Sequence, residues 1–285
     1  MISHLPWREM ARVRGIIHIY IIYETVNINY HMKKNDSIVE ILARYSRLIR
    51  LPGKGKAVFV GDTHGDFDAT ASIFRLYFKP GYTLVFLGDY VDRGDESLKN
   101  LEFLLKKKAE APEQVFLLAG NHEGYCSVPF SPADFWESLA PKEYEYFSEI
   151  CKLFSFAAVT QNGLFAVHGA TPDLTSLEEI DTVQLCSEHW MQLTWGDFIE
   201  QPGEFLGDQS GRPAYGEDYF NRTMKQLGLN VLIRSHQPNI NPVIFNKRCL
   251  TLMSSYYYTF ERHVAIVDLE KPVIRSVDDL EIVEI

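Results

Sequence analysis

Cysteine is scarce in this sequence, and no two cysteines stand close together. The chain has four, Cys126, Cys151, Cys186 and Cys249, without a CxxC pair among them. Zinc knuckles and redox dithiols need closely spaced pairs, so this spacing predicts neither kind of site. Since a chain with so few thiols does not depend on disulfides, we expect a reducing, cytoplasmic environment.

Positive charge is also in short supply. The chain carries 28 Lys and Arg against 38 Asp and Glu, a formal net charge of -10 at pH 7. Binding to the phosphate backbone of nucleic acids requires concentrated Lys and Arg. This charge balance therefore argues against nucleic acid as the main partner. It does not exclude a local basic pocket.

Apolar runs long enough to cross a membrane are missing as well. The most apolar stretch near the N-terminus, GIIHIYIIY at residues 15–23, is far shorter than the roughly 20 residues that a membrane helix needs. Arg8, Arg12 and Arg14 precede it, as in a signal peptide, but the polar stretch that follows has no small-residue cleavage site. We therefore predict neither a membrane span nor secretion.

What the chain does contain is the composition of a globular domain, with 285 residues, 46% hydrophobic and 23% charged. Between positions 37 and 51, apolar residues recur at three- and four-residue steps. This pattern predicts a helix with one buried face that ends at Pro52 and Gly53. Residues 1–36 are therefore predicted to be an extension, and residues 37–285 one domain.

Five short apolar runs of β character are each followed by a polar loop. They are AVFV before Gly61, TLVFL before Gly88, VFLLA before Gly120, LFAV before His168 and VLIR before Ser235. Helical patterns lie at 67–79, 95–110, 132–156 and 217–227, and further strand patterns at 250–255 and 263–269. The lysines at 106–108 are interpreted as a solvated helix end. Alternating strands and helices predict an α/β fold whose loops converge on one site.

The first two loops concentrate carboxylates, an imidazole and a guanidinium. GDTHG contains Asp62 and His64, which can point to the same side and bind one cation. GDYVDRG contains Asp89, Asp92 and Arg93 within a single tight loop. Such a density of buried charge is costly unless a metal ion or an anion compensates it. These loops therefore predict an ion-binding site.

The next three loops add imidazole and amide donors. GNHE contains Asn121, His122 and Glu123, while His168 begins the fourth loop and His236 lies in the fifth. The donors suited to two cations such as Mn, Fe or Zn are Asp62, His64, Asp89, Asn121, His168 and His236. Two such cations about 3.5–4 Å apart can hold a bridging hydroxide as nucleophile and clamp an in-line phosphoryl displacement. Asp89 is the best candidate for a ligand shared by both.

Each motif also has a simpler interpretation when it is taken alone. GDTHG can be an Asx-type turn with a buried histidine, and VDRG a structural ion pair. His168 and His236 can be satisfied core histidines. Five such loops in order, each after a strand pattern, favour the functional interpretation.

The motifs GDTHG, GDYVDRG, GNHE, VHG and SHQ, in that order over residues 61–238, resemble those of the PPP family of metal-dependent serine/threonine protein phosphatases. This family is part of the calcineurin-like metallophosphoesterase superfamily, and the resemblance is nearest to its compact prokaryotic members, including archaeal ones. It implies a four-layer α/β/β/α fold with a central β-sandwich. It also implies that residues 37–285 form a metallophosphatase catalytic domain.

The resemblance implies a role for each matching residue. The first metal would be bound by Asp62 and His64, the second by Asn121, His168 and His236, and both by Asp89. His122 would be the general acid, and Asp92 would orient it. The substrate phosphate would be bound by Arg93, Arg212 and Asn121.

The chain departs from the family pattern at a few positions. Tyr258 aligns weakly with a tyrosine over the active site, because a nearby proline is absent and the following stretch is shortened. Thr259 falls where eukaryotic members often have a reactive cysteine, so covalent capture by microcystin-type toxins is not expected. Asp197 resembles an acidic position near the site, and a helix-capping role is equally open.

The resulting hypothesis is hydrolysis of phosphoserine and phosphothreonine esters in proteins, with two divalent metal ions, first of all Mn, and His122 as the acid. The alternative is a dinucleoside polyphosphate hydrolase such as diadenosine tetraphosphatase, which shares the GD-H-G and GNH motifs. Glu123 and the intact VDRG loop favour the protein phosphatase. A catalytically silent scaffold predicts damaged ligands, and none is missing here. Phosphorylated proteins are the expected partners, rather than nucleic acid or membranes.

Overall fold

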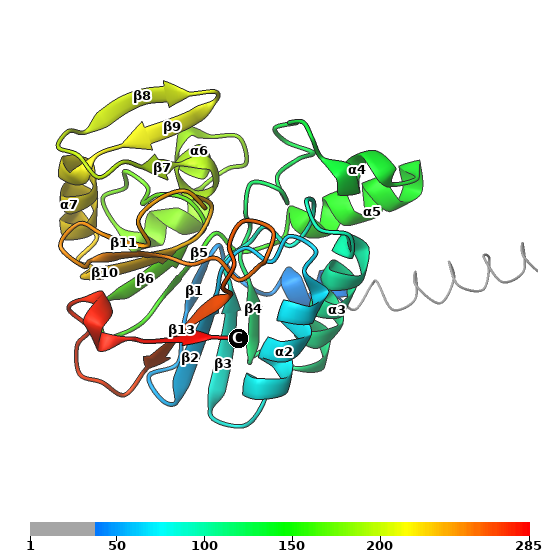
Figure 1. Cartoon of the computed structure of the whole chain (residues 1–285), viewed down its shortest axis with the longest axis horizontal. Helices are drawn as coiled ribbons and strands as arrows, with labels where there is room; N and C mark the ends of the chain where they lie inside the picture. The colour runs from blue at the N-terminus through cyan, green and yellow to red at the C-terminus, as the bar shows by residue number, and fades with distance from the viewer. Residues whose placement is uncertain (1–37) are drawn as a thin grey trace, which may run out of the picture.

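The structure is a computed structural model that describes residues 38–285. At its centre, two β-sheets face each other (Figure 1). One sheet has six strands in the order β1-β5-β6-β10-β12-β11, and the other has five in the order β14-β13-β2-β3-β4. The predicted extension at residues 1–36 lies outside the described residues.

The strands of both sheets follow the apolar runs of the sequence. In the six-stranded sheet they are β1 (Leu48–Arg50), β5 (Ala157–Val159), β6 (Leu164–Val167), β10 (Val231–Arg234), β12 (Cys249–Thr251) and β11 (Val243–Ile244). In the five-stranded sheet they are β14 (Glu281–Glu284), β13 (His263–Asp268), β2 (Lys56–Val60), β3 (Tyr82–Phe86) and β4 (Val115–Leu117). Strands β2, β3 and β4 run parallel, as do β6, β10 and β12, so their carboxyl ends meet at one edge of each sheet.

Side chains alternate between two hydrophobic cores. In β2, Ala57 and Phe59 pack between the sheets, while Val58 and Val60 belong to the core that contains the helices. Every one of these side chains is fully buried. Strands covered on both faces read as unbroken apolar runs, which explains the pattern in the sequence.

Helices cover the outer faces of both sheets (Figure 1). The helices α2 (Phe67–Tyr77) and α3 (Ser97–Glu110) lie beside β2, β3 and β4, while α6 (Glu188–Trp195) and α7 (Glu217–Gln226) lie beside the six-stranded sheet. The structure also describes two more helices, α4 (Asp134–Ser138) and α5 (Pro141–Cys151), two 3-10 turns, η1 (Leu177–Thr182) and η2 (Val277–Asp279), and a helical segment at residues 38–42. The predicted four-layer α/β/β/α architecture is confirmed. Within residues 38–285, no helix has the length and apolarity to cross a bilayer.

Two of the helix predictions are wrong in part. The predicted helix over 37–51 ends at Leu42 among the described residues, and Leu48–Arg50 forms β1, which pairs in parallel with β5. A short apolar run fits either structure, and here tertiary pairing decides. The predicted helix over 132–156 is broken into α4 and α5, because Pro141 can begin a helix but cannot continue one.

A small third sheet, absent from the sequence predictions, lies above the six-stranded sheet in Figure 1. It consists of β7 (Asp197–Phe198), β9 (Arg212–Tyr215) and β8 (Phe205–Gln209), in that order. Its strands are short, and β8 contains Gly207 at an irregular step in its pairing with β9. Such strands leave little periodic signal. The sheet nevertheless brings two predicted site residues, Asp197 and Arg212, next to each other.

Candidate metal centre and active site

The loop after β2 turns sharply at the edge of its sheet. Gly61 stands so close to the next layer that a Cβ atom there would lie 2.2 Å from the carbonyl oxygen of Leu252. The following residue, Asp62, is buried and forms an isolated parallel bridge with Met253. His64 has a positive φ of 41°, and its Nδ1 bonds to the carbonyl oxygen of Val91 at 2.8 Å. Its Nε2 is thereby directed toward the carboxylates.

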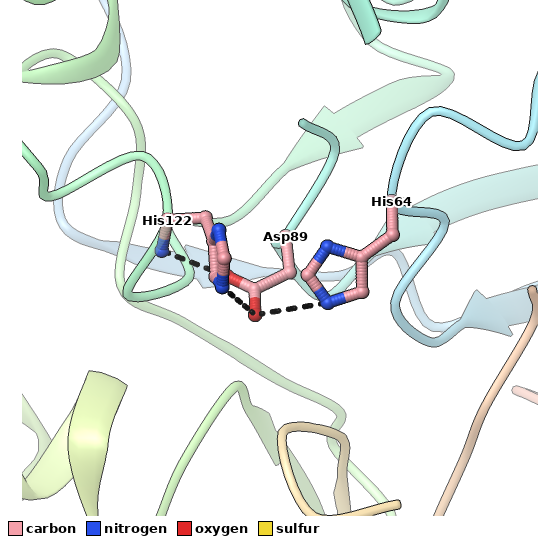
Figure 2. A group of neighbouring side chains, drawn as sticks. All are labelled: His64, Asp89 and His122. Carbon is pink, nitrogen blue, oxygen red and sulfur yellow. Dashed lines mark hydrogen bonds and ion pairs between the residues drawn. The ribbon is translucent and has the colours of Figure 1, made fainter. Parts of the chain in front are cut away.

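The loop after β3 places Asp89 at the centre of the site. The preceding Gly88 has a φ of 113°, and a Cβ atom there would lie 2.3 Å from the backbone nitrogen of Gly120. One oxygen of Asp89, Oδ2, lies 3.7 Å from Nε2 of His64 and 3.9 Å from Nε2 of His122. Figure 2 shows the two imidazoles on either side of this carboxylate.

Two groups of side chains in the described part of the chain could each hold a metal ion, and they share Asp89. One group is His64, Asp89 and His122, and the other is Asp89, His168 and His236. In each group the donor atoms lie within 4.8 Å of one another. A carboxylate common to two sites is the arrangement expected of a bridging ligand.

The two remaining predicted ligands lie at the same place. Asp62 Oδ2 is 3.7 Å from Nε2 of His64, and Asn121 Oδ1 is 3.2 Å from Nε2 of His168. The same nitrogen of His168 is 3.1 Å from Nδ1 of His236. The structure thus brings all six predicted ligands together, and all six are buried. Imidazole, carboxylate and amide donors at these separations fit a pair of borderline divalent cations.

Burial and the charges of neighbouring groups shift the pKa values of these side chains in different directions. Burial, and then the neighbouring His122, lower the pKa of His64 to about 3. Burial followed by the charge of Arg212 holds the pKa of His236 well below its usual range. Burial and the charge of Asp89 raise the pKa of Asp62 to about 6. Burial also opposes ionisation of Asp89, but His168 and His122 outweigh it and hold its pKa well below the usual value. Burial lowers the pKa of His168, but the charge of Asp89 outweighs it, so this pKa lies above its usual value. Metals bind neutral imidazoles and charged carboxylates, so His64 and His236 are already in the binding form and His168 would release its proton on binding.

His122 is held by two carboxylates. Its Nδ1 is 2.6 Å from Oδ2 of Asp92, and its backbone nitrogen donates to Oδ1 of Asp89 at 2.9 Å. Asp92 is itself fixed, because its Oδ1 accepts a hydrogen bond from the backbone nitrogen of Phe135. Burial lowers the pKa of His122, but the charges of Asp89 and Asp92 outweigh it, so the pKa lies above its usual value. The pairing predicted between Asp92 and His122 is therefore present, with Nε2 left facing the centre.

The two predicted phosphate-binding arginines differ in their surroundings. Arg93 donates to the carbonyl oxygen of Pro132 and to the hydroxyl of Tyr258, whose ring lies 5.4 Å from that of His64. Arg212 makes two hydrogen bonds to Asp197, at 2.9 and 2.7 Å. Tyr258 therefore does lie beside the site.

Two roles were open for Asp197, an acidic position near the site and a helix cap, and the structure shows the first. It follows α6 directly, whose C-cap is Gly196, and its Oδ1 lies 3.5 Å from Nε2 of His236. It caps neither α6 nor α7, because the N-cap of α7 is Gly216. Asp197 is instead an acidic residue at the site, where it holds Arg212.

Glu123 has a structural role that the sequence reasoning missed. Its Oε2 accepts hydrogen bonds from the backbone nitrogens of Asp89 and Gly120, and its Oε1 accepts one from Tyr90. One buried carboxylate thus ties the loop after β3 to the loop after β4. Its place in the GNHE motif indicates that it lies near the site but not which backbone groups of the other loop it binds.

Arg234 and Ser235, at the end of β10, were missed as well. The guanidinium of Arg234 is fully buried and donates to the carbonyl oxygens of Gly169 and Gly196. The hydroxyl of Ser235 accepts from the backbone nitrogen of Asp62 and lies 2.5 Å from Oδ1 of that residue. Both side chains therefore connect the loop of His236 to other loops of the site.

The sequence and the fold are similar to those of known phosphatases. The calcineurin-like phosphoesterase family matches residues 55–239. A probable serine/threonine-protein phosphatase of Encephalitozoon cuniculi is 30% identical over 221 residues, 71% of this chain and 48% of that protein. A putative serine/threonine-protein phosphatase of Schizosaccharomyces pombe is 28% identical over 242 residues, 78% of this chain and 76% of that protein. This chain thus spans about half the length of the first relative.

Among solved structures, a protein serine/threonine phosphatase from Saccharomyces cerevisiae matches with a TM-score of 0.76. The match covers 90% of this chain and 89% of that one, at 21% sequence identity. At this identity the likeness establishes the fold. The layered architecture described above is therefore also the fold of that phosphatase.

Proposed function

Because this chain belongs to the calcineurin-like phosphoesterase family, we propose that it hydrolyses phosphoserine and phosphothreonine esters in proteins. The observation that carries the proposal is the pair of ligand groups that share Asp89, with the Asp92–His122 pair beside them. The names of the relatives support the choice of a protein substrate.

In this proposal, Asp62 and His64 would bind one ion, Asn121, His168 and His236 would bind the other, and Asp89 would be a ligand of both. When bound, two divalent ions would supply positive charge at the phosphoryl oxygens and would lower the pKa of water, so that a hydroxide nucleophile is available at neutral pH. Manganese is our first choice, and iron or zinc also suits nitrogen and oxygen donors.

His122 is proposed to protonate the leaving group. An alkoxide that departs from serine or threonine requires a proton, and Nε2 of His122 faces the centre while Nδ1 is held by Asp92 at 2.6 Å. The carboxylate of Asp92 orients the ring and stabilises its protonated form. The proton passes from Nε2 to the oxygen of the departing side chain.

Arg93, Arg212 and Asn121 are proposed to bind the phosphoryl oxygens. Arg212 uses Nε and one terminal nitrogen for Asp197, which leaves Nη1 without a hydrogen bond among residues 38–285. A guanidinium held in this way presents a fixed donor to an anion. Arg93 lies on the same loop as Asp89, and its Nε donates a hydrogen bond to the hydroxyl of Tyr258.

A substrate panel tests the function. With Mn added, we expect turnover of p-nitrophenyl phosphate and of phosphoserine and phosphothreonine peptides, and loss of turnover with a chelator. Equal or greater kcat/KM for diadenosine tetraphosphate would instead assign the chain to the nucleotide hydrolases. No turnover of any of these substrates in the metal-loaded protein would refute both functions.

We further propose that the protein acts in the cytoplasm on phosphorylated proteins, with neither nucleic acid nor a membrane as partner. None of its four cysteines is paired in a disulfide, and Cys151 and Cys249 are buried. The formal charge of -10 disfavours polyanionic partners.

A further inference from the structure

The loop between β12 and β13 passes beside the candidate metal centre. It has the sequence SSYYYTFER at residues 254–262, and we call it the tyrosine loop. At its base, the hydroxyl of Ser254 donates to the carbonyl oxygen of His263 at 2.6 Å. Near its middle, the ring of Tyr258 lies 5.4 Å from that of His64. The position of this loop therefore decides what stands next to one of the candidate ligands.

Apolar packing contributes little to holding the outer part of the tyrosine loop. The side chains of Tyr256, Tyr257 and Phe260 are all exposed. Because hydrophobic stabilisation is proportional to the apolar area removed from water, exposed rings of this kind supply little of it. The loop therefore depends on hydrogen bonds to its neighbours for a fixed position.

One carboxylate, that of Asp66, accepts three hydrogen bonds from the tyrosine loop. Its Oδ2 accepts from the backbone nitrogen of Tyr256 at 3.0 Å and from Nε of Arg262 at 2.9 Å, and its Oδ1 accepts from Nη2 of Arg262. Both side chains of this ion pair are only 13% exposed. The guanidinium also lies over the ring of Tyr256, 3.7 Å from its centre. A bidentate pair that is largely shielded from water fixes its partners more firmly than an exposed pair does.

Asp66 itself is part of a fixed element. It is the N-cap of α2, where its Oδ1 also accepts from the backbone nitrogen of Ala69 at 3.2 Å. It stands two residues after His64 in the first ligand loop. The ion pair with Arg262 therefore attaches the tyrosine loop to the start of a helix that is continuous with the candidate metal centre.

The tyrosine loop in turn holds Arg93. Nε of Arg93 donates to the hydroxyl of Tyr258 at 3.2 Å, and its Nη1 donates to the carbonyl oxygen of Pro132 at 2.8 Å. Its Nη2 has no hydrogen bond among residues 38–285, so it remains for an oxygen of the substrate phosphate. A guanidinium that is already held at two nitrogens loses less conformational freedom when it binds an anion.

From these contacts we propose that Asp66 and Arg262 are positioning residues for phosphate binding. They fix the tyrosine loop, the loop fixes the hydroxyl of Tyr258, and this hydroxyl orients Arg93 toward the phosphoryl group. The inference rests on the proposed phosphatase function. Since neither member of the ion pair contacts the substrate in this scheme, the effect of each depends on Tyr258.

Two single variants test the inference on the Mn-loaded protein. Asp66→Asn removes the charge that pairs with Arg262 but keeps an oxygen for the cap of α2, since Asn is as good an N-cap as Asp. Arg262→Met removes the guanidinium and keeps an unbranched side chain. In each we expect kcat/KM for p-nitrophenyl phosphate and for a phosphoserine peptide to fall about 10-fold. The fall should come mainly from KM, because a phosphate contact is weakened in the ground state and the transition state alike.

The same substitutions in a Tyr258→Phe background show whether the ion pair acts through the hydroxyl. Tyr258→Phe already lacks the group that orients Arg93, so adding Asp66→Asn or Arg262→Met should change kcat/KM by less than about 2-fold. A structural role alone would lower kcat/KM equally with and without the hydroxyl, and such additivity would overturn the inference. Single variants with the kcat/KM of the unaltered protein would overturn it too.

Hydrogen exchange gives a readout that does not depend on turnover. In Asp66→Asn and Arg262→Met we expect the backbone amides of residues 254–262 to exchange at least about 10-fold faster, because the loop has lost its attachment to α2. Exchange at the unaltered rate in both variants would contradict the proposal. Asp66→Asn, which keeps the helix cap, suffices for this test if Arg262→Met does not fold.

Two controls separate positioning from other effects. Arg50→Met is the matched control, since Arg50 pairs with Glu178 where the side chains are 55% and 74% exposed, and it should change neither kcat nor KM. Mn content by mass spectrometry should equal that of the unaltered protein in Asp66→Asn and Arg262→Met. A loss of Mn that accounts for the lost activity would overturn the inference, because the pair would then support the ligands instead. If the unaltered protein hydrolyses neither substrate, the proposed function is wrong and the inference falls with it.

Discussion

At the scale of single residues, His122 is the side chain whose role is most sharply testable. It belongs to one of the two groups that could hold a metal, yet its Nδ1 is already bound to Asp92. We predict that His122→Asn retains both metal ions and lowers kcat by roughly 100- to 10,000-fold, the usual contribution of a general acid. Metal content by mass spectrometry and kcat with phosphopeptides check this prediction.

The two measurements separate an acid from a ligand. If His122 were a ligand, His122→Asn would contain about one metal ion less per chain, and excess Mn would restore part of the activity. His263→Asn is the control, because this partly exposed histidine lies outside both groups. It should change neither quantity.

Lys108 is a buried cation, although the lysines at the end of α3 were interpreted as solvated. It is only 2% exposed, and its Nζ lies 3.5 Å from the centre of the Tyr45 ring and donates to the carbonyl oxygen of Pro112. Burial lowers the pKa of Lys108 to about 7, against a smaller opposing effect of Glu113. The spacing of the lysines identified the helix end but not which of them faces the core.

This burial makes stability depend on pH. Between about pH 7 and pH 10.5 the unfolded chain binds more protons at Lys108 than the folded chain does, so its contribution to stability increases as pH rises. We predict that Lys108→Met is more stable than the unaltered protein at pH 7 and that this advantage shrinks by roughly 3 kcal/mol by pH 10, because each pKa unit corresponds to about 1.4 kcal/mol. Urea unfolding at four pH values measures it. A difference that is constant with pH would contradict the prediction, and Lys106→Met, on the exposed side of α3, should give a constant difference.

At the scale of elements, the sequence predicts strands and loops better than helix boundaries. The five strands that precede the polar loops were predictable because both of their faces are buried, which leaves an unbroken apolar run. Helices α2, α3 and α7 were also predicted at nearly their observed positions. Strand β1 was not, since its conformation depends on pairing with β5, more than 100 residues away in the chain.

For the candidate site, too, some features could be predicted from the sequence and others could not. The predicted ligands could be found because each stands directly after a strand, where parallel topology brings loops together. The roles of Glu123, Arg234 and Ser235 could not, because their partners are backbone atoms of other loops. Such contacts depend on how the loops meet, and no local pattern encodes them.

Glu123 is the link between two of these loops, and its removal should loosen both. In Glu123→Gln, an amide NH₂ must face at least one of the backbone nitrogens of Asp89, Tyr90 or Gly120, so a donor opposes a donor. We predict a loss of about 1–3 kcal/mol in the free energy of unfolding. Burial and the charge of Asp89 raise the pKa of Glu123 to about 7, so urea unfolding is best measured at pH 8, where the carboxylate is charged.

An exposed glutamate provides the comparison. Glu137→Gln on α4 changes the same functional group where no buried backbone depends on it, and it should alter stability by less than about 0.5 kcal/mol. Equal urea midpoints for Glu123→Gln and the unaltered protein would show that the two loops do not depend on this carboxylate.

At the scale of the whole molecule, the candidate metal centre lies where the two sheets meet. Asp62, Asp89 and Asn121 follow strands of the five-stranded sheet, whereas His168 and His236 follow β6 and β10 of the six-stranded sheet. The layers are joined by the apolar core between them and, at one edge, by this cluster of charged and polar groups. Ions bound there would connect the sheets, so binding and global stability are expected to be coupled.

We therefore predict that metal removal lowers the melting temperature of the whole domain. At a Mn concentration 100-fold above its dissociation constant, binding stabilises the folded state by about 2.7 kcal/mol, which corresponds to a rise of roughly 5–10 °C over the chelated protein. Mg at the same concentration should give a smaller rise, because it prefers an all-oxygen shell and three of the six donors are histidines.

Differential scanning calorimetry of Asp89→Asn decides whether the effect comes from this centre. Asn is nearly the same size as Asp but lacks the charge that would hold both ions, so the variant should lose most of the Mn-dependent rise while remaining folded. Asp181→Asn, outside both ligand groups on η1, is the control and should keep the full rise. An undiminished rise in Asp89→Asn would mean that Mn stabilises the protein from another position, and the shared carboxylate would lose its proposed role in joining the two sheets.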